Sequence, residues 1–191
     1  MTRWLCAPAL VLVAALAACS KHEPPPAPAP TVVAPPVGAA VVDGPASVAE
    51  GRRDAAEIEG RRADLRRVAG RLTTGDSNTS FEAYYDGNAL RHVAETTGYG
   101  SLGKGRRRYY LDSTGVLFYF HAEDERGVTQ AGGQQPDGSS IHIVFDSAGN
   151  VRASEKRLNG RPTELLDSDV RGALARLGAL RQAAEAGAQP R

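Results

Sequence analysis

The chain is poor in cysteine, since its 191 residues include only Cys6 and Cys19. Both lie close to the N-terminus, and no cysteine follows from residue 20 to residue 191. The later part of the chain therefore cannot form an internal disulfide, and a domain folded there must be held together by its core alone.

The chain also lacks an excess of charge of either sign, with 23 basic and 22 acidic side chains. Proteins that bind nucleic acid usually carry a basic excess. We therefore expect no nucleic-acid partner.

Sequence motifs of catalysis are missing as well. The sequence contains no HExxH, no GxSxG and no paired-cysteine motif, which are the patterns of zinc peptidases, serine hydrolases and zinc or redox sites. We therefore predict no catalytic residue, no metal site and no cofactor, and expect that the protein is not an enzyme.

One glycine-rich stretch, GYGSLGKG at 98–105, partly fits phosphate-binding patterns. Gly98, Gly100 and Gly103 match GxGxxG, and 98–104 matches the first seven positions of a P-loop. However, Gly105 stands where a P-loop has Ser or Thr, and RRRYYL then reads as a strand rather than a helix. We predict a hairpin loop and no nucleotide.

The N-terminus carries an apolar run at 7–18, preceded by Arg3. This run is shorter than the roughly 20 residues of a membrane-spanning helix. It has the layout of a secretory signal, with the small residues Ala17 and Ala18 before Cys19.

The stretch Leu16-Ala17-Ala18-Cys19 resembles the lipobox of bacterial lipoproteins. The resemblance implies that residues 1–18 are a signal peptide and that Cys19 receives diacylglycerol and then an amide-linked acyl chain such as palmitate. Several acyl chains anchor a protein stably to a membrane. The alternative is an ordinary secretory signal with an incidental cysteine.

Ser20 follows the cysteine, and in the enterobacterial pattern a serine there permits transfer to the outer membrane. We therefore expect a cell-envelope protein, lipid-anchored to the outer membrane and facing the periplasm. Residues 19–44 are rich in proline and alanine, which predicts a disordered linker of polyproline II type.

Residues 45–191 have the size of a single domain, which we expect to be α+β. Ser47 and Glu50 form a capping box. Ile58, Leu65, Val68 and Leu72 follow at helical spacing. The pattern predicts a helix over 47–72.

Residues 80–160 predict an antiparallel meander of about six strands. Three apolar or aromatic runs each end in an aspartate and a glycine turn, at Asp86-Gly87, 112–115 and 146–149, and a second run follows each turn. This is a threefold hairpin repeat, in which aspartate caps the turn and glycine supplies a positive φ.

An amphipathic helix is predicted over 166–186 and is expected to cover one face of the sheet. Its expected apolar stripe is Leu166, Val170, Leu174, Leu177 and Ala184.

A basic cluster, Lys104 with Arg106 to Arg108, lies beside two tyrosines. It suits an anionic partner such as lipopolysaccharide phosphates or peptidoglycan carboxylates. The alternative is a solvated strand end that the acidic run 123–125 balances across a hairpin.

The faces of the sheet follow from alternation along the strands. We expect Phe118 and Phe120 to point inward under a helix. The outer face would then be an aromatic and basic contact surface, and nearby guanidinium groups disfavour a cation there. Its members are Arg106, Arg108, Tyr119, His121 and His142.

The sequence thus favours a non-catalytic envelope lipoprotein that binds an envelope protein, peptidoglycan or lipopolysaccharide, or that serves as a structural module. The alternative is a lipid-anchored periplasmic hydrolase. Two converging carboxylates, or a histidine beside aspartate and serine, would favour the enzyme.

Overall fold

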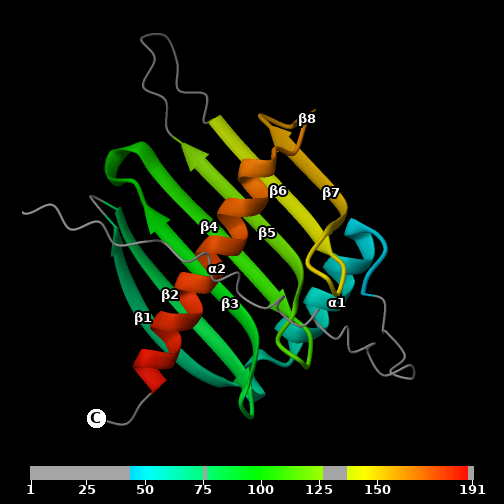
Figure 1. The fold of residues 1–191 in the computed structure, drawn as a ribbon. Coiled ribbons are helices and arrows are strands. Elements are labelled where there is room, and N and C mark those ends of the chain that lie inside the picture. The colour runs from blue at the N-terminus through cyan, green and yellow to red at the C-terminus, as the bar shows by residue number, and fades with distance from the viewer. Residues whose placement is uncertain (1–43, 75–76, 127–136, 189–191) are drawn as a thin grey trace, which may run out of the picture. The chain divides into compact units, whose positions relative to one another are not determined.

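The computed structural model of the chain describes residues 44–74, 77–126 and 137–188. These residues form an α+β domain with one eight-stranded antiparallel sheet and a helix near each end (Figure 1). The sequence predicted the α+β class and the meander correctly, but expected about six strands. The strands follow one another in chain order from β1 to β8.

Helix α1 spans Val48–Gly60 and begins as the sequence predicts. Ser47 is its N-cap, and the Ser47 hydroxyl accepts a hydrogen bond of 3.2 Å from the Glu50 amide. The predicted extension to residue 72 is wrong. A short 3-10 turn at Arg62–Asp64 is followed by strand β1 at Arg66–Thr74.

The residues of β1 that suggested a helix are also compatible with a strand. Leu65, Val68 and Leu72 fit a helical spacing, but Val68 and Leu72 also share one face of a strand with Gly70 between them. Both side chains pack into the sheet core. Gly70 leaves room for the Phe81 ring, since a Cβ atom there would come within 2.6 Å of Phe81 Cε1.

The three predicted hairpins form the middle of the sheet. Strands β2 (Ser77–Asp86) and β3 (Ala89–Gly98) make the first, β4 (Gly103–Leu111) and β5 (Leu117–Arg126) the second, and β6 (Asp137–Phe145) and β7 (Val151–Leu158) the third. Gly87, Gly115 and Gly149 have the positive φ expected of their turns. A further strand, β8 at Arg161–Thr163, follows the Asn159-Gly160 turn that the prediction overlooked.

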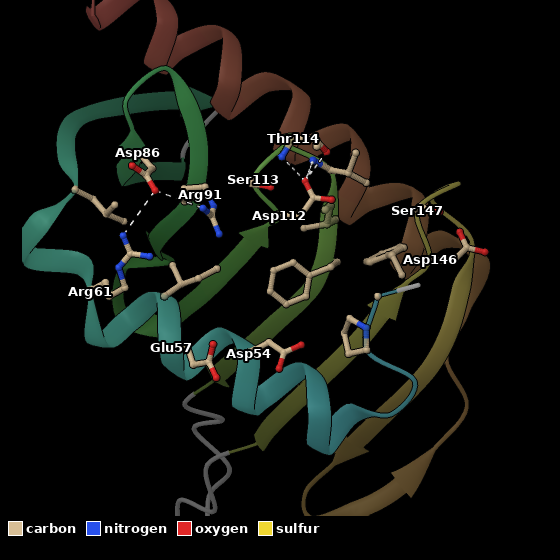
Figure 2. A pocket seen from close by; sticks show the side chains of 18 residues that line it. Asp54, Glu57, Arg61, Asp86, Arg91, Asp112, Ser113, Thr114, Asp146 and Ser147 are labelled. Carbon is tan, nitrogen blue, oxygen red and sulfur yellow. Dashed lines mark hydrogen bonds and ion pairs between the residues drawn. The ribbon is translucent and has the colours of Figure 1, made fainter. Parts of the chain in front are cut away.

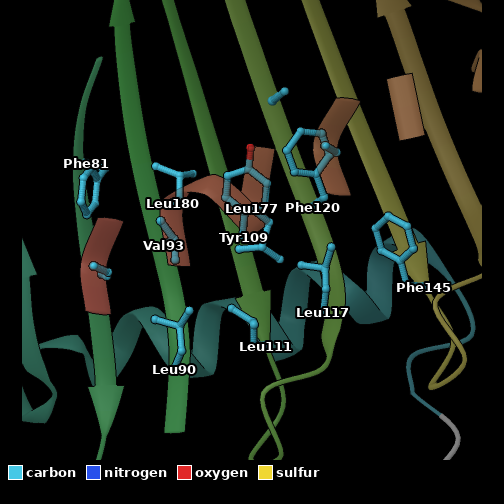
Figure 3. Packing of buried hydrophobic residues seen from close by; sticks show 14 of the residues in the cluster. Phe81, Leu90, Val93, Tyr109, Leu111, Leu117, Phe120, Phe145, Leu177 and Leu180 are labelled. Atoms are coloured by element: carbon cyan, nitrogen blue, oxygen red, sulfur yellow. The ribbon is translucent and has the colours of Figure 1, made fainter. Parts of the chain in front are cut away.

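Helix α2 spans Asp167–Ala188 and lies across one face of the sheet (Figure 1). Its buried residues are Ala173, Leu177, Leu180 and Ala184. Leu166 and Leu174, which were expected in the stripe, are 51% and 40% exposed. Figure 3 shows the core of this face, to which Tyr109, Phe120 and Phe145 contribute rings.

Helix α1 packs on the other face of the sheet. Ala55 and Ile58 contact a second cluster built on Tyr110, Tyr119 and Val144. These residues adjoin Tyr109, Phe120 and Ile143 of the α2 face in sequence, as alternation along a strand requires. The sheet is therefore covered on both faces.

Candidate functional site: a cleft between helix α1 and three turns

A half-open cleft of about 420 Å³ lies between α1 and the turns of the three hairpins (Figure 2). Aspartates from all three turns line it, namely Asp86, Asp112 and Asp146. The repeat read from the sequence thus places one turn of each hairpin at a common site. Its floor is apolar and is formed by Ile58, Leu65, Val116, Leu117, Phe118 and Phe145.

Three β-bulges beside the turns direct side chains toward this cleft. In each hairpin the returning strand contains one extra residue, which is Arg91 in β3, Phe118 in β5 and Arg152 in β7. Arg91 and Phe118 line the cleft, and Arg152 donates a hydrogen bond of 3.1 Å to the carbonyl oxygen of Gly44, itself a lining residue. Bulges re-aim side chains in this way.

Because of the bulge at Phe118, the two faces of β5 differ from those that the sequence predicted. Phe120 lies under α2 as expected, but Phe118 packs on the α1 side together with Tyr119. Tyr110 pairs with Tyr119, and Leu111 pairs with Leu117, so the strand gains one residue between the two pairs. This one-residue change of register turns Phe118 and Phe120 to opposite faces.

The cationic groups of the cleft gather at one end. Asp86 lies 3.8 Å from Arg61 and 3.6 Å from Arg91, measured between carboxylate oxygen and guanidinium nitrogen. Arg91 Nε also donates to the Leu111 carbonyl oxygen at 3.2 Å. Both arginines therefore lie beside a carboxylate of the protein itself, although the Arg61 side chain is 65% exposed.

Four further carboxylates line the remainder of the cleft. Asp54 and Glu57 come from α1, and Asp112 and Asp146 come from the second and third turns (Figure 2). Among the described residues, the ion pair of Asp54 is a 3.9 Å contact with its neighbour Arg53, and Glu57 has none. The lining is acidic overall, with five carboxylates and two guanidinium groups.

Hydrogen bonds from their own turns favour the ionised forms of Asp112 and Asp146. Asp112 Oδ1 accepts hydrogen bonds from the amides of Thr114 and Val116 at 2.8 and 2.9 Å. Although burial opposes it, the bonds from this turn lower the Asp112 pKa. Bonds from Asn150 lower the pKa of Asp146 in the same way.

Outside the cleft, the structure brings four of the five predicted contact residues together. Arg108, Tyr119, His121 and His142 line a shallow depression beside α1. The rings of His121 and His142 are stacked at 4.2 Å, and Arg108 Nη1 lies 3.3 Å from His121 Nδ1. Arg106 lies apart and pairs with Glu125 at 3.7 Å.

This group is not the open surface that the sequence suggested. Tyr119 is only 3% exposed and His142 only 8% exposed, because α1 crosses this face. Gly51 of α1 allows the approach, since a Cβ atom there would lie 2.9 Å from Tyr119 Cδ2. His142 does point away from the α2 core, as predicted, but it points into a second core.

The basic cluster on β4 is largely neutralised by β5, as the alternative reading proposed. Lys104 lies 3.2 Å from Glu125, and Arg107 lies 3.6 Å from Asp124. The loop before it also follows the prediction, because a 3-10 turn at Gly100–Leu102 leads directly into strand β4.

Sequence reasoning missed a buried carboxylate under α2. The side chain of Glu95 is fully buried, and it accepts hydrogen bonds from Arg176 Nε at 2.8 Å and from the Tyr109 hydroxyl at 3.0 Å. Its position in strand β3 gave no sign of a partner 81 residues away.

Within the described ranges, no group of three or more His, Cys, Asp or Glu side chains is arranged to hold a metal ion. In the same part of the chain, neither helix has the length and apolarity of a membrane span. Cys19 and the linker lie outside the described residues.

Comparison of the chain with protein-family models, with curated proteins and with solved structures gave no match.

Proposed function

We propose that this chain is a lipid-anchored cell-envelope protein whose domain is a non-catalytic binding module, with the cleft as its binding site. The anchor is Cys19, through the resemblance of residues 16–19 to a lipobox. In this proposal the linker at 19–44 tethers the domain to the outer membrane on its periplasmic side.

The cleft is the observation that carries the binding role. Binding sites for small ligands are concave, largely apolar, and typically 300–1,000 Å³ in volume, with a few polar groups that orient the ligand. The cleft, at about 420 Å³, combines an apolar floor with a charged rim. Its walls come from one helix and three turns, two of which are capped by their own aspartates, and these elements hold the shape in advance of binding.

The cleft brings carboxylates of α1 and of two turns together, as the alternative of a lipid-anchored hydrolase requires, but two observations count against that alternative. No histidine is among the described residues that line it. A general acid needs a raised pKa, whereas the pKa values of Asp112 and Asp146 are lowered. These observations favour binding over catalysis.

Of the expected partners, an anionic glycan or lipopolysaccharide was suggested by the basic cluster on β4. The ion pairs of Lys104 and Arg107 with β5 remove most of that support. The acidic rim of the cleft instead favours a ligand without net negative charge.

The anchor is tested by Cys19→Ala, with Cys6→Ala as the matched control. We expect radiolabelled palmitate in the wild type and in Cys6→Ala, and none in Cys19→Ala, which should leave the detergent phase. An unlabelled wild-type chain would refute the anchor.

A further variant, Ser20→Asp, should move the protein to the inner membrane under the enterobacterial pattern, and unchanged fractionation would refute the assignment to the outer membrane.

The binding role is tested with a fluorophore at the rim of the cleft. Because the chain has only two cysteines, a full-length Cys6→Ala/Cys19→Ala chain can carry one environment-sensitive dye at Ser147→Cys. We expect blue-shifted emission that returns toward the solvent value when hexanol displaces the dye. The control is Ser101→Cys, an exposed site that does not line the cleft. Solvent-like emission at both sites would overturn the proposal.

A further inference from the structure

The distribution of charge around the cleft indicates a ligand class. At one end, Arg61 and Arg91 share the single carboxylate of Asp86. Along the rest of the rim, Asp54, Glu57, Asp112 and Asp146 face the cleft with no cationic lining residue beside them other than those two arginines. An apolar ligand that settles on the floor therefore comes close to more lining carboxylates than lining cations.

We propose that the cleft binds a small amphiphilic amine, with its hydrocarbon part on the floor between Ile58 and Phe118 and its ammonium group among the carboxylates of α1 and the second and third turns. This inference rests on the proposed binding role of the cleft. The hydrocarbon supplies affinity through apolar burial. The ammonium supplies discrimination, because carboxylates attract a cation and repel an anion.

The carboxylates of the rim divide into two kinds. Asp112 and Asp146 each have Oδ1 held by hydrogen bonds from their own turns and act as negative charges fixed in position. Asp54 and Glu57 are about one helical turn apart on α1, and among the described residues their one ion pair is the 3.9 Å contact of Asp54 with the exposed Arg53, so both can bond an ammonium group directly. Neutralising Asp54 and Glu57 should therefore remove the preference for an amine over a neutral ligand without disturbing any turn.

The experiment uses the full-length chain labelled at Ser147→Cys and titrates it with hexylammonium, hexanol and hexanoate. These probes share a six-carbon chain and differ in charge. We expect hexylammonium to bind most tightly and hexanoate most weakly. With Asp54→Asn and Glu57→Gln together, hexylammonium should bind roughly five- to tenfold more weakly, while hexanol is unchanged. Added salt should weaken hexylammonium alone.

The matched control is Asp64→Asn with Glu164→Gln, which removes two exposed carboxylates that do not line the cleft. It should leave all three affinities unchanged. Equal binding of hexylammonium and hexanol would overturn the amine inference and leave the binding role standing. Failure of all three probes to displace the dye would overturn both.

Discussion

The hydroxyl of Tyr119 lies 2.7 Å from Nδ1 of His142, and helix α1 covers both rings. This pair is part of a row of ring contacts, stacked except for the tilted pair of Tyr110 and Tyr119, that runs across the sheet through Tyr110 and His92. His92 is fully buried, and its Nε2 lies 3.5 Å from Glu59 Oε1 without forming a hydrogen bond. The face that was expected to meet a partner is therefore a second core.

Acid should destabilise this domain through its buried histidines. Burial lowers the pKa of both His92 and His142 to about 4, from an ordinary value of 6.5. The unfolded chain therefore binds more protons than the folded chain between these values, and stability falls as the pH drops from 6.5 to 4. The loss should reach about 2 to 3 kcal/mol per histidine. Denaturant melts across this range measure it.

The variant His142→Asn isolates one contribution, because asparagine can still bond the Tyr119 hydroxyl but does not titrate. The decline in stability between pH 6.5 and 4 should be shallower than in the wild type. An identical decline would show that His142 does not contribute.

Tyr119→Ala should be as costly as a core truncation. The sequence suggested a small effect, under about 1 kcal/mol, for a surface tyrosine. With the ring 3% exposed, we expect a loss of about 3 kcal/mol or more, similar to that for Phe120→Ala. Tyr119→Phe keeps the ring and removes only the hydroxyl, which bonds His142, so it should cost about 1 kcal/mol. Equal losses of stability for Tyr119→Phe and Tyr119→Ala in thermal melts would contradict this account.

Gly51 should resist substitution, whereas Gly60 on the same helix should not. A Cβ atom at Gly51 would lie 2.9 Å from Tyr119 Cδ2 and 3.1 Å from Val144 Cγ2. Gly51→Ala should therefore push α1 from the sheet and cost about 1 to 3 kcal/mol. At Gly60 nothing lies within 4 Å of the added atom, so Gly60→Ala should be neutral or stabilising by up to about 1 kcal/mol. Chemical denaturation of the two variants tests the docking of α1.

Glu95 should fix α2 to the sheet. Glu95→Ala removes the carboxylate that pairs with Arg176, whereas Arg107 keeps its contact with Asp124, and breaking such a buried pair costs about 3 to 5 kcal/mol. The control is Glu125→Ala, which breaks the exposed pair with Lys104 and should cost less than about 1 kcal/mol. Comparable losses in urea denaturation would show that Glu95 is not a buried anchor.

The sequence by itself determined the features that depend on neighbouring residues. The helix start at Ser47, the three aspartate and glycine turns and the terminal helix all rest on local hydrogen bonds or on periodicity, and the structure confirms them. Each of these signals lies within a few residues of the element it specifies.

Only the tertiary structure decided what depends on distant packing. Residues 66–74 fit a helix or a strand equally well, and pairing with β2 made them a strand. The one-residue bulge at Phe118 assigned the faces of β5, and α1 converted a presumed outer surface into a core. The cleft itself arises because a meander brings alternate turns to one end of the sheet, where α1 crosses them. No local sequence pattern predicts the cleft, since its lining residues are separated by up to about a hundred residues and are held together by burial of apolar surface.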